Sequence, residues 1–520
     1  MRTISLRPLN FLLLIFDAWG VFLISSTGNY DIFQLQNIIC FLFLILAPGV
    51  LTLYALRLRD LPVWGYISLV IAFSLLELML AGLLGNTILP LFGVLAPLSK
   101  SFVVIEVTIL VALLSLVPLV RMEDAVIPIP RYPRARDIVL SFSPVLLTFM
   151  SVLGTVRLND GASGIVTLVM LGGIGAYLLY LLRYAEEVGG DTIPTGIFFI
   201  ALALLLMTSL RGWYITGHDI QLEYKVFELT KNAGLWSMAA YRDAYNACLS
   251  ITILPTVFSA VLNVYDQYIY KFYFQIFFAL CPGLVYLISN RWTGRRISLL
   301  SAIYFLALPT FSSDMPFLVR QEVAFLFFGL MIYVLFEPAF SIRLRRLLFM
   351  MMGAGVIISH YSTTYTVLLI LGITVASRPL VALTLRYLQG RGFLRECALD
   401  ATVRYITGGM VLALVLLSFV WTSRRRSRSS GSSSRRRSRS SRRSDCCICS
   451  SGDHSCERSI SNSIFSRRSL SSSSLATRYF PYSRLSMASS ARCSRRCSCS
   501  RRSWSSAVSR WDERSLHARK

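Results

Sequence analysis

The chain has 520 residues, 55% of which are hydrophobic, and its mean hydropathy is +0.60. This apolar excess is typical of proteins that cross a membrane many times, and it excludes an ordinary soluble domain. The formal net charge of +25 would suggest nucleic-acid binding, but residues 1–422 contribute only +6 of it and residues 423–520 contribute +19. We therefore expect no nucleic-acid partner for the hydrophobic part of the chain.

Apolar runs of about 17–25 residues recur along the chain, and this is the length that crosses about 30 Å of hydrocarbon as a helix. They predict an all-α, polytopic membrane protein with about thirteen transmembrane helices. The first run has no clear small-x-small cleavage motif, so we expect a span there rather than a cleaved signal peptide. The predicted spans are 9–26, 36–56, 62–85, 101–120, 138–156, 162–183, 193–210, 266–289, 298–311, 317–337, 346–360, 363–377 and 405–421.

The runs divide the chain into three regions. Residues 1–192 form the predicted N-terminal membrane module, and residues 193–422 form a second membrane module with a long loop at 211–265. The segment 250–264 within that loop is too short to span comfortably and contains Pro255, so we expect it to be interfacial or re-entrant. Residues 423–520 form a low-complexity tail rich in Ser, Arg and Cys.

The distribution of basic residues predicts the orientation of the chain. If the N-terminus is cytoplasmic, the inner loops carry 20 Lys and Arg and the outer loops carry 6, although the outer loop 211–265 is the longest. Basic residues are enriched in cytoplasmic loops of membrane proteins. We therefore expect a multi-pass protein of the plasma membrane with a cytoplasmic N-terminus and with residues 211–265 outside.

The outer loop begins with the charged stretch "RGWYITGHDIQLEYKVFELTKNAGLW". Apolar residues at Ile220, Tyr224 and Phe227 predict a short amphipathic helix on the membrane, which ends near Gly234. One interpretation of the charges is structural, because Thr216 and Asp219 fit a capping box and interfacial helices carry charge on one face. The other is functional. Asp219 and Glu223 are like charges at i and i+4, so we expect a metal, a basic side chain or a cationic substrate beside them.

Two more ionisable residues are predicted on the same outer face. Arg320 lies at the outer end of the span in "DMPFLVRQEVAFLFF", and His360 lies at the outer turn in "ISHYSTTY". Arg320 could simply snorkel to the headgroups, and His360 could make only a local hydrogen bond. Ionisable residues at the rim of a helix bundle are costly unless they are paired or functional, so we favour one aqueous site that gathers them.

At "RGWYITGHDIQLEYKVFELTKNAGLW", "YNACLSITILPTVFS", "DMPFLVRQEVAFLFF" and "ISHYSTTY" the chain resembles a family of large, uncharacterised multi-pass membrane proteins from archaea. The early stretch "FLFLILAPGVLTLYALRLRDLPVWGYISLV" is similar to the N-terminal membrane module of the same proteins, so the resemblance covers about residues 35–421. That family in turn resembles the C-fold membrane glycosyltransferases, which take sugars from polyprenyl-phosphate carriers. In those enzymes an acidic residue in the first large outer loop acts on the acceptor or binds metal, and Asp219 occupies that place here.

The resemblance implies a glycosyltransferase-like protein that uses a lipid-linked sugar on the outer face of the membrane. Asp219 would be the general base, and Glu223 would share a divalent metal ion with it or hold its neighbours in place. Arg320 would bind the substrate phosphate, with His360 and Arg211 behind it. The implied partners are membrane lipids and the lipid-linked sugar.

The alternative function is non-catalytic, as a transporter or flippase for a glycan lipid or as an assembly factor. A transporter is expected to have broken helices with charges near the bilayer midplane. The charges that would fit this alternative are Asp17, Glu77 and Glu106, all in the N-terminal half.

The tail at 423–520 holds 35 Ser, 24 basic residues and 7 Cys, so we expect it to be disordered. It could be an RNA-binding tail, or its cysteines could bind metal or form disulfides, although they show no regular CxxC pairing. We favour a third interpretation, in which the reading frame slips just after Trp421. The parity of the spans places residue 423 outside, where 24 basic residues would break the charge rule that the other loops obey. Re-reading the gene around codon 421 in all frames tests this interpretation.

Overall fold

The computed structural model describes residues 2–27, 34–390 and 405–423, and the predicted tail after its first residue, Ser423, lies outside these residues. The described chain is mostly helical and has very little strand, which confirms the all-α prediction. Its two strands, β1 (Arg2–Leu6) and β2 (Ala125–Ile129), pair antiparallel with Arg2 opposite Ile129.

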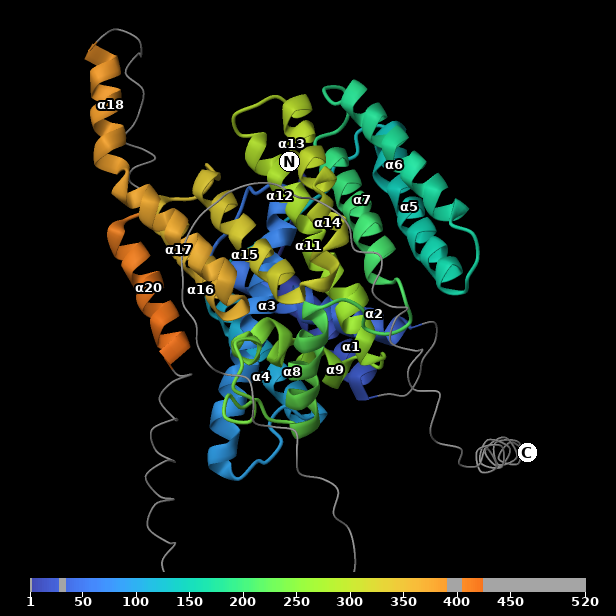
Figure 1. Cartoon of the computed structure of the whole chain (residues 1–520). Helices are drawn as coiled ribbons and strands as arrows, with labels where there is room; N and C mark the ends of the chain where they lie inside the picture. Colours follow the sequence, from blue (N-terminus) through green and yellow to red (C-terminus); the bar gives the residue numbers. More distant parts are fainter. Residues whose placement is uncertain (1, 28–33, 391–404, 424–520) are drawn as a thin grey trace, which may run out of the picture. The chain divides into compact units, whose positions relative to one another are not determined.

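The helices follow the order of the apolar runs (Figure 1). Seven of them precede the predicted outer loop: α1 (Pro8–Thr27), α2 (Leu35–Ala55), α3 (Val63–Ile88), α4 (Lys100–Arg121), α5 (Ala135–Asn159), α6 (Ile165–Arg183) and α7 (Thr192–Ser209). The loop contains α8 (Asp219–Ala233) and α9 (Ile253–Val261). The helices after it are α10 (Asp266–Tyr268), α11 (Phe274–Phe278), α12 (Leu280–Ser289), α13 (Arg295–Ala307), α14 (Pro309–Ser313), α15 (Val319–Phe336), α16 (Ile342–Ser359), α17 (Tyr361–Ala376), α18 (Arg378–Gly390) and α20 (Gly408–Ser423).

Nine helical segments of the described chain are long and apolar enough to cross a membrane, or up to eleven if two bent pairs each count as one span. The chain is therefore a multi-pass membrane protein by length and composition, while the number thirteen stays a prediction. Two predicted spans fall outside this set, 346–360 in α16 and 405–421 in α20. α16 begins with a basic first turn and a half, "IRLRR", and α20 has only 16 residues.

The central helices differ from the peripheral ones in how much of their surface is buried. The apolar windows of α3 and α7 are 67% and 72% buried, whereas those of α4 and α6 are each 22% buried. A helix that is apolar all round and little buried within the protein is suited to face lipid. α3 packs against α9, α12 and α15, so helices from both sides of the predicted module boundary at residue 192 share one core.

Residues 250–264 form a short buried segment inside the bundle. They contain a 3₁₀ turn (Leu249–Ile251) and α9, and every residue from Ile253 to Phe258 is buried. α9 packs against α3, α4 and α8. Nine residues rise only about 14 Å, so α9 cannot cross a bilayer, and its burial fits the re-entrant alternative better than the interfacial one.

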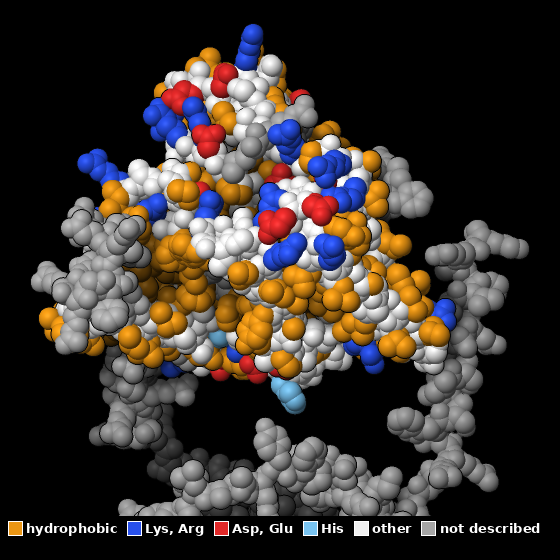
Figure 2. Space-filling model, turned by 90° about the horizontal axis from the view of Figure 1, so that it is seen from above, with side chains coloured by type: hydrophobic (Ala, Val, Ile, Leu, Met, Phe, Trp, Pro, Cys, Tyr) orange, Lys and Arg blue, Asp and Glu red, His pale blue; other side chains and the backbone are white. Residues whose placement is uncertain are grey.

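The connections between helices gather at two opposite ends. We call the end formed by residues 56–62, 122–134, 184–191 and 290–294 the basic face, and the end formed by residues 89–99, 160–164 and 210–265 the α8 face. α7 runs from the first to the second over 18 residues, or about 27 Å. In Figure 1 the basic face is at the top, near α13, and α8 and α9 are at the bottom. Figure 2 shows the basic face, where Lys and Arg side chains gather together with Asp and Glu.

Candidate functional site

The helix predicted in the outer loop is α8, and its sequence explains both ends. Gly217 precedes it with φ of 122°, and an added Cβ there would come within 3.0 Å of Phe317 Cγ. Gly234 ends it with φ of 59°, a left-handed conformation that glycine adopts at low cost. The stop predicted at this glycine is correct.

The capping box that would explain the charges of α8 structurally is not present. His218 is the N-cap, and α8 has no side-chain capping hydrogen bond. The Thr216 hydroxyl donates to the carbonyl of Arg211 at 3.3 Å, so no capping box forms. Asp219 lies in the first helical turn, where its carboxylate still interacts favourably with the helix dipole.

Arg320 from α15 bridges the two carboxylates of α8. Its Nη1 donates to Glu223 Oε1 at 2.6 Å, and its Nη2 donates to Asp219 Oδ2 at 2.8 Å. The cation expected beside Asp219 and Glu223 is therefore a basic side chain. The described residues contain no group of three or more His, Cys, Asp and Glu that could hold a metal ion. We call these three residues the acid–arginine cluster.

The guanidinium of Arg320 is enclosed by protein. Its side chain is 5% exposed, and its Cζ lies 3.8 Å from the centroid of the Tyr245 ring. Arg320 therefore does not snorkel, because paired carboxylates and a cation–π contact hold it in the interior. With both terminal nitrogens engaged, it cannot present a two-nitrogen fork to a phosphate unless a carboxylate releases it.

Glu223 is the buried member of the cluster, and its side chain is 0% exposed. Burial raises its pKa to about 7, against the opposing effect of the Arg320 charge. Its Oε2 atom is buried without a hydrogen-bond partner among the described residues. Asp219 differs from it, since 42% of the Asp219 side chain is exposed at the α8 face.

His360 lies between α16 and α17 and is 4% exposed. Its Nδ1 lies 2.8 Å from the hydroxyl of Thr363, so the predicted local hydrogen bond is present. Burial, together with the nearby Arg320 charge, lowers its pKa to about 4. His360 is thus uncharged at neutral pH. An uncharged His360 can still offer a hydrogen bond to a phosphate, and its phosphate-binding role stays a prediction.

Arg211 is the expected site residue that the structure does not bring to the cluster. Its side chain is exposed, and its main-chain carbonyl accepts from Lys271 Nζ at 3.3 Å. Lys271 also donates to the carbonyls of Gly212 at 2.6 Å and Tyr214 at 2.8 Å. A buried ammonium with three carbonyl partners fixes the main chain just before α8, and the phosphate-binding role of the Arg211 side chain stays a prediction.

Four residues near the cluster were not predicted as site residues: Tyr245, Lys271, Gln275 and Glu322. Glu322 is fully buried and accepts from Gln275 Nε2 at 3.2 Å, while its Oε1 has no partner among the described residues. A polar residue within an apolar span was the only signal for Lys271, Gln275 and Glu322. No local pattern marks Tyr245.

Three asparagines attach the outer segment to the helices beneath it. Each amide pairs with the main chain of residues 210–263, as donor and acceptor at once. Asn86 of α3 accepts from Trp236 N at 2.7 Å and donates to Trp236 O at 2.9 Å. Asn37 of α2 accepts from the N–H of Asn263 and donates to its carbonyl. Asn159 of α5 accepts from the N–H of Gly212 and donates to the carbonyl of Leu210. These contacts attach the main chain on both sides of α8 to α2, α3 and α5.

The charges named for the transporter alternative do not come together. Asp17 is exposed on α1, and Glu77 accepts a hydrogen bond from Thr52 between α2 and α3. Glu106 of α4 lies against the backbone at Gly85. The described residues thus assemble no shared site from these three carboxylates.

The chain was compared with family models, with curated proteins and with solved structures. No family model, no curated protein and no solved structure matches it.

Proposed function

We propose that this protein is an integral-membrane, glycosyltransferase-like protein that takes a sugar from a lipid-linked carrier at the α8 face. We place that face outside the plasma membrane, with the N-terminus in the cytoplasm, and we include the chain in the archaeal family that it resembles. The proposal is supported chiefly by one observation, the half-exposed carboxylate of Asp219 held by a buried arginine of a membrane helix.

The cluster offers the groups that glycosyl transfer from a phosphate carrier needs. A carboxylate that reaches the aqueous face could accept the proton of an acceptor hydroxyl, and Asp219 is the exposed carboxylate of the cluster. A guanidinium close by could stabilise the leaving phosphate, and the Nε–H of Arg320 has no hydrogen-bond partner among the described residues. Glu223 would orient Arg320, and neutral His360 would add a hydrogen bond.

A transporter of a glycan lipid is the second candidate, and one observation favours it. The span Asp266–Ser289 is interrupted by a π-helical turn (Ile269–Tyr273), which contains Lys271. π-turns within helices are frequent at functional sites, and discontinuous helices are typical of transporters.

Replacing Asp219 by Asn tests the proposal. Asn keeps the size and the hydrogen-bonding ability of the side chain but cannot accept the proton. We expect Asp219→Asn to lower the rate of sugar transfer from a polyprenyl-phosphate donor by about 10²–10⁴-fold. The assay uses membranes that contain the full chain, with radiolabelled donor, and the unfolding temperature of the variant checks that it is folded.

Glu228→Gln is the matched control, since Glu228 lies on the same helix, is 41% exposed and, within the described part of the chain, forms an ion pair with Lys225 alone. It should transfer at the wild-type rate. Unchanged transfer by Asp219→Asn would contradict the proposed catalytic role and favour the transporter.

A further inference from the structure

A second site lies at the end of the molecule opposite the acid–arginine cluster. A cavity of about 640 Å³ opens on the basic face, within the range of about 300–1,000 Å³ that is usual for small-ligand sites. Five separate segments line it: the start of α3, the chain before α5, the loop before α7, the end of α12 and the start of α13. The proposed glycosyl transfer uses none of these residues.

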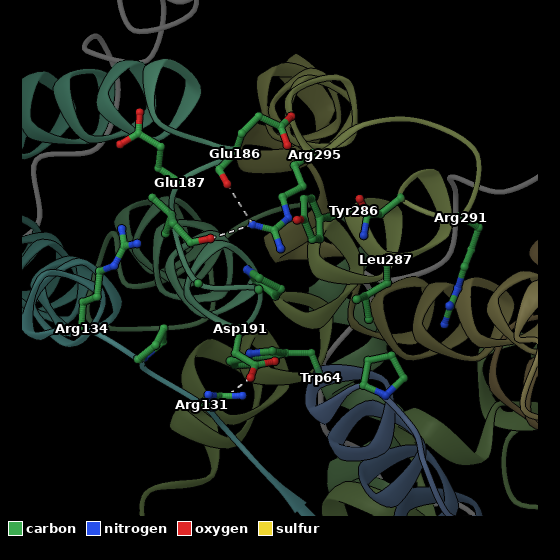
Figure 3. Close-up of a pocket in the computed structure, with 17 residues that line it drawn as sticks. Trp64, Arg131, Arg134, Glu186, Glu187, Asp191, Tyr286, Leu287, Arg291 and Arg295 are labelled. Atoms are coloured by element: carbon green, nitrogen blue, oxygen red, sulfur yellow. Dashed lines mark hydrogen bonds between the residues drawn. The ribbon is translucent and has the colours of Figure 1, made fainter. Parts of the chain in front are cut away.

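Arginines from three of these segments point to an anionic ligand. Arg131, Arg134, Arg291 and Arg295 all line the cavity. Arg291 is neutralised by an ion pair with the buried Glu337. Arg295 is different, because its Nη1 donates to the main-chain carbonyls of Val188 at 2.8 Å and Glu186 at 3.4 Å. These carbonyls fix the guanidinium without cancelling its charge, and Figure 3 shows it reaching into the middle of the lining residues, beside Tyr286.

Two helix N-termini add to the positive potential of the cavity. α13 begins at Arg295, and α7 begins at Thr192, directly after the lining residue Asp191. A helix N-terminus carries about half a positive charge and unpaired N–H groups, and both favour a phosphate. The N-termini of both helices thus lie at the cavity, because Arg295 of α13 and Pro194 of α7 are among its lining residues.

The acidic residues of the lining are partly engaged already. Asp191 Oδ2 accepts from the backbone N–H of Arg131 at 2.9 Å, and Glu187 Oε2 pairs with Arg136 at 3.4 Å. Burial raises the pKa of Asp191, against the effect of the hydrogen bond from the Arg131 backbone. The side chains of Glu186 and Glu187 stay exposed at the rim, where their carboxylates can accept from hydroxyl or amine groups of a ligand.

We propose that this cavity binds a phosphate-bearing polar headgroup, with the phosphate against Arg295, Arg131 and Arg134 and its hydroxyl or amine groups towards Glu186 and Glu187. The headgroup could belong to an anionic membrane lipid or to a soluble phosphate compound. Basic pockets between membrane helices at the cytoplasmic surface are suited to such headgroups. The cavity does not include Asp219, so a test of headgroup binding is separate from a test of glycosyl transfer.

The test measures binding to the purified full chain by calorimetry and by the shift in unfolding temperature. One arm adds inorganic pyrophosphate to protein in neutral detergent. The other compares nanodiscs of phosphatidylcholine with and without phosphatidylglycerol. We expect binding in at least one arm. Arg295→Gln and Arg134→Gln should each weaken it about tenfold or more, as expected for the loss of a charge-assisted hydrogen bond.

Arg296→Gln is the matched control, because Arg296 is exposed beside Arg295 and does not line the cavity. It should bind as the wild type does. Arg134→Gln is included because it should leave the fold intact: Arg134 is exposed and has no ion pair among the described residues. Weaker binding by this variant therefore cannot be explained by misfolding. Binding of pyrophosphate supports a soluble ligand, and stabilisation by phosphatidylglycerol alone supports a lipid. Absence of binding in both arms, or equal loss in Arg296→Gln and Arg295→Gln, would overturn the proposal.

Discussion

Arg320 joins two carboxylates that differ in their exposure to solvent. Glu223 is fully buried, whereas 42% of the Asp219 side chain is exposed. Breaking a buried ion pair costs about 3–5 kcal/mol, but an exposed pair contributes about 1 kcal/mol or less. The Glu223–Arg320 pair therefore contributes most of the stability of the cluster. Asp219 can act as a catalytic group at little cost in the free energy of unfolding.

Glu223 should make the stability of the protein depend on pH. Burial raises its pKa to about 7 from 4.5, so between these values the folded protein holds a proton that the unfolded chain releases. The stabilisation from this group is fully present below about pH 4.5 and is lost as the pH rises through about 7. Glu223→Gln cannot ionise, so its unfolding temperature should fall less over this range than that of the wild type, measured in detergent.

The other charged groups around Glu223 define the controls for this experiment. Arg320 and Asp219 belong to the cluster, Tyr270 donates to the Glu223 main-chain carbonyl at 3.4 Å, and buried Glu322 lies on α15. Glu228→Gln changes a carboxylate on the same helix outside the cluster, and it should keep the wild-type slope. A Glu223→Gln protein with the same slope would show that another group carries the pH dependence.

At the scale of elements, contacts of the neighbouring segments help to place α8, in addition to those that its own Asp219 and Glu223 make with Arg320. Asn37, Asn86 and Asn159 attach the segment around α8 to α2, α3 and α5, and Lys271 holds the turn before it. A side-chain amide that donates and accepts replaces the pairing that a strand or helix would give the main chain. These contacts allow an irregular segment to keep Asp219 within hydrogen-bond distance of a residue on another helix.

Removing one of these amides should loosen the segment locally. In Asn86→Ala the N–H and C=O of Trp236 lose their partners, and we expect a loss of about 1–3 kcal/mol in stability. Amide hydrogen exchange of residues 234–238 should become faster. Asn232→Ala, at an exposed position near the end of α8, should leave that exchange unchanged. Equal exchange in both variants would mean that the Asn86 contacts do not hold the segment.

At the scale of the whole molecule, the two sites lie at opposite ends of α7 and α15. Arg320 is in the first turn of α15, and Glu337 follows its last residue and pairs with Arg291 of the cavity lining. If the positive-inside prediction is right, the acid–arginine cluster faces the exterior and the cavity faces the cytoplasm.

Labelling of single cysteines in intact cells should decide the orientation. Lys225 on the α8 face is 58% exposed, and Arg296 on the basic face is also exposed. With the native cysteines replaced, a membrane-impermeant thiol reagent should label Lys225→Cys from outside and should label Arg296→Cys only after the cells are opened. Labelling of Arg296→Cys in intact cells would reverse the orientation and with it the proposed location of glycosyl transfer.

Much of this arrangement follows from local features of the sequence. The length of an apolar run decides whether it can cross a membrane as a helix, so most of the described spans coincide with predicted ones. The apolar spacing in α8 and the glycine after it predict that helix and its end. The repulsion between Asp219 and Glu223 predicts a neighbouring cation, because like charges one turn apart are unfavourable by themselves.

Only the tertiary structure identifies that cation and decides which face of α8 is buried. Arg320 is 101 residues from Asp219 and 97 from Glu223, and no local pattern joins positions so far apart. Glu223 shares a stripe with the buried residues Ile220 and Phe227, but helical periodicity alone did not reveal that a carboxylate faces inwards. The basic cavity likewise arises from five segments that meet only when the helices pack. Spans depend on hydrophobicity along the chain, whereas both sites depend on long-range contacts between helices.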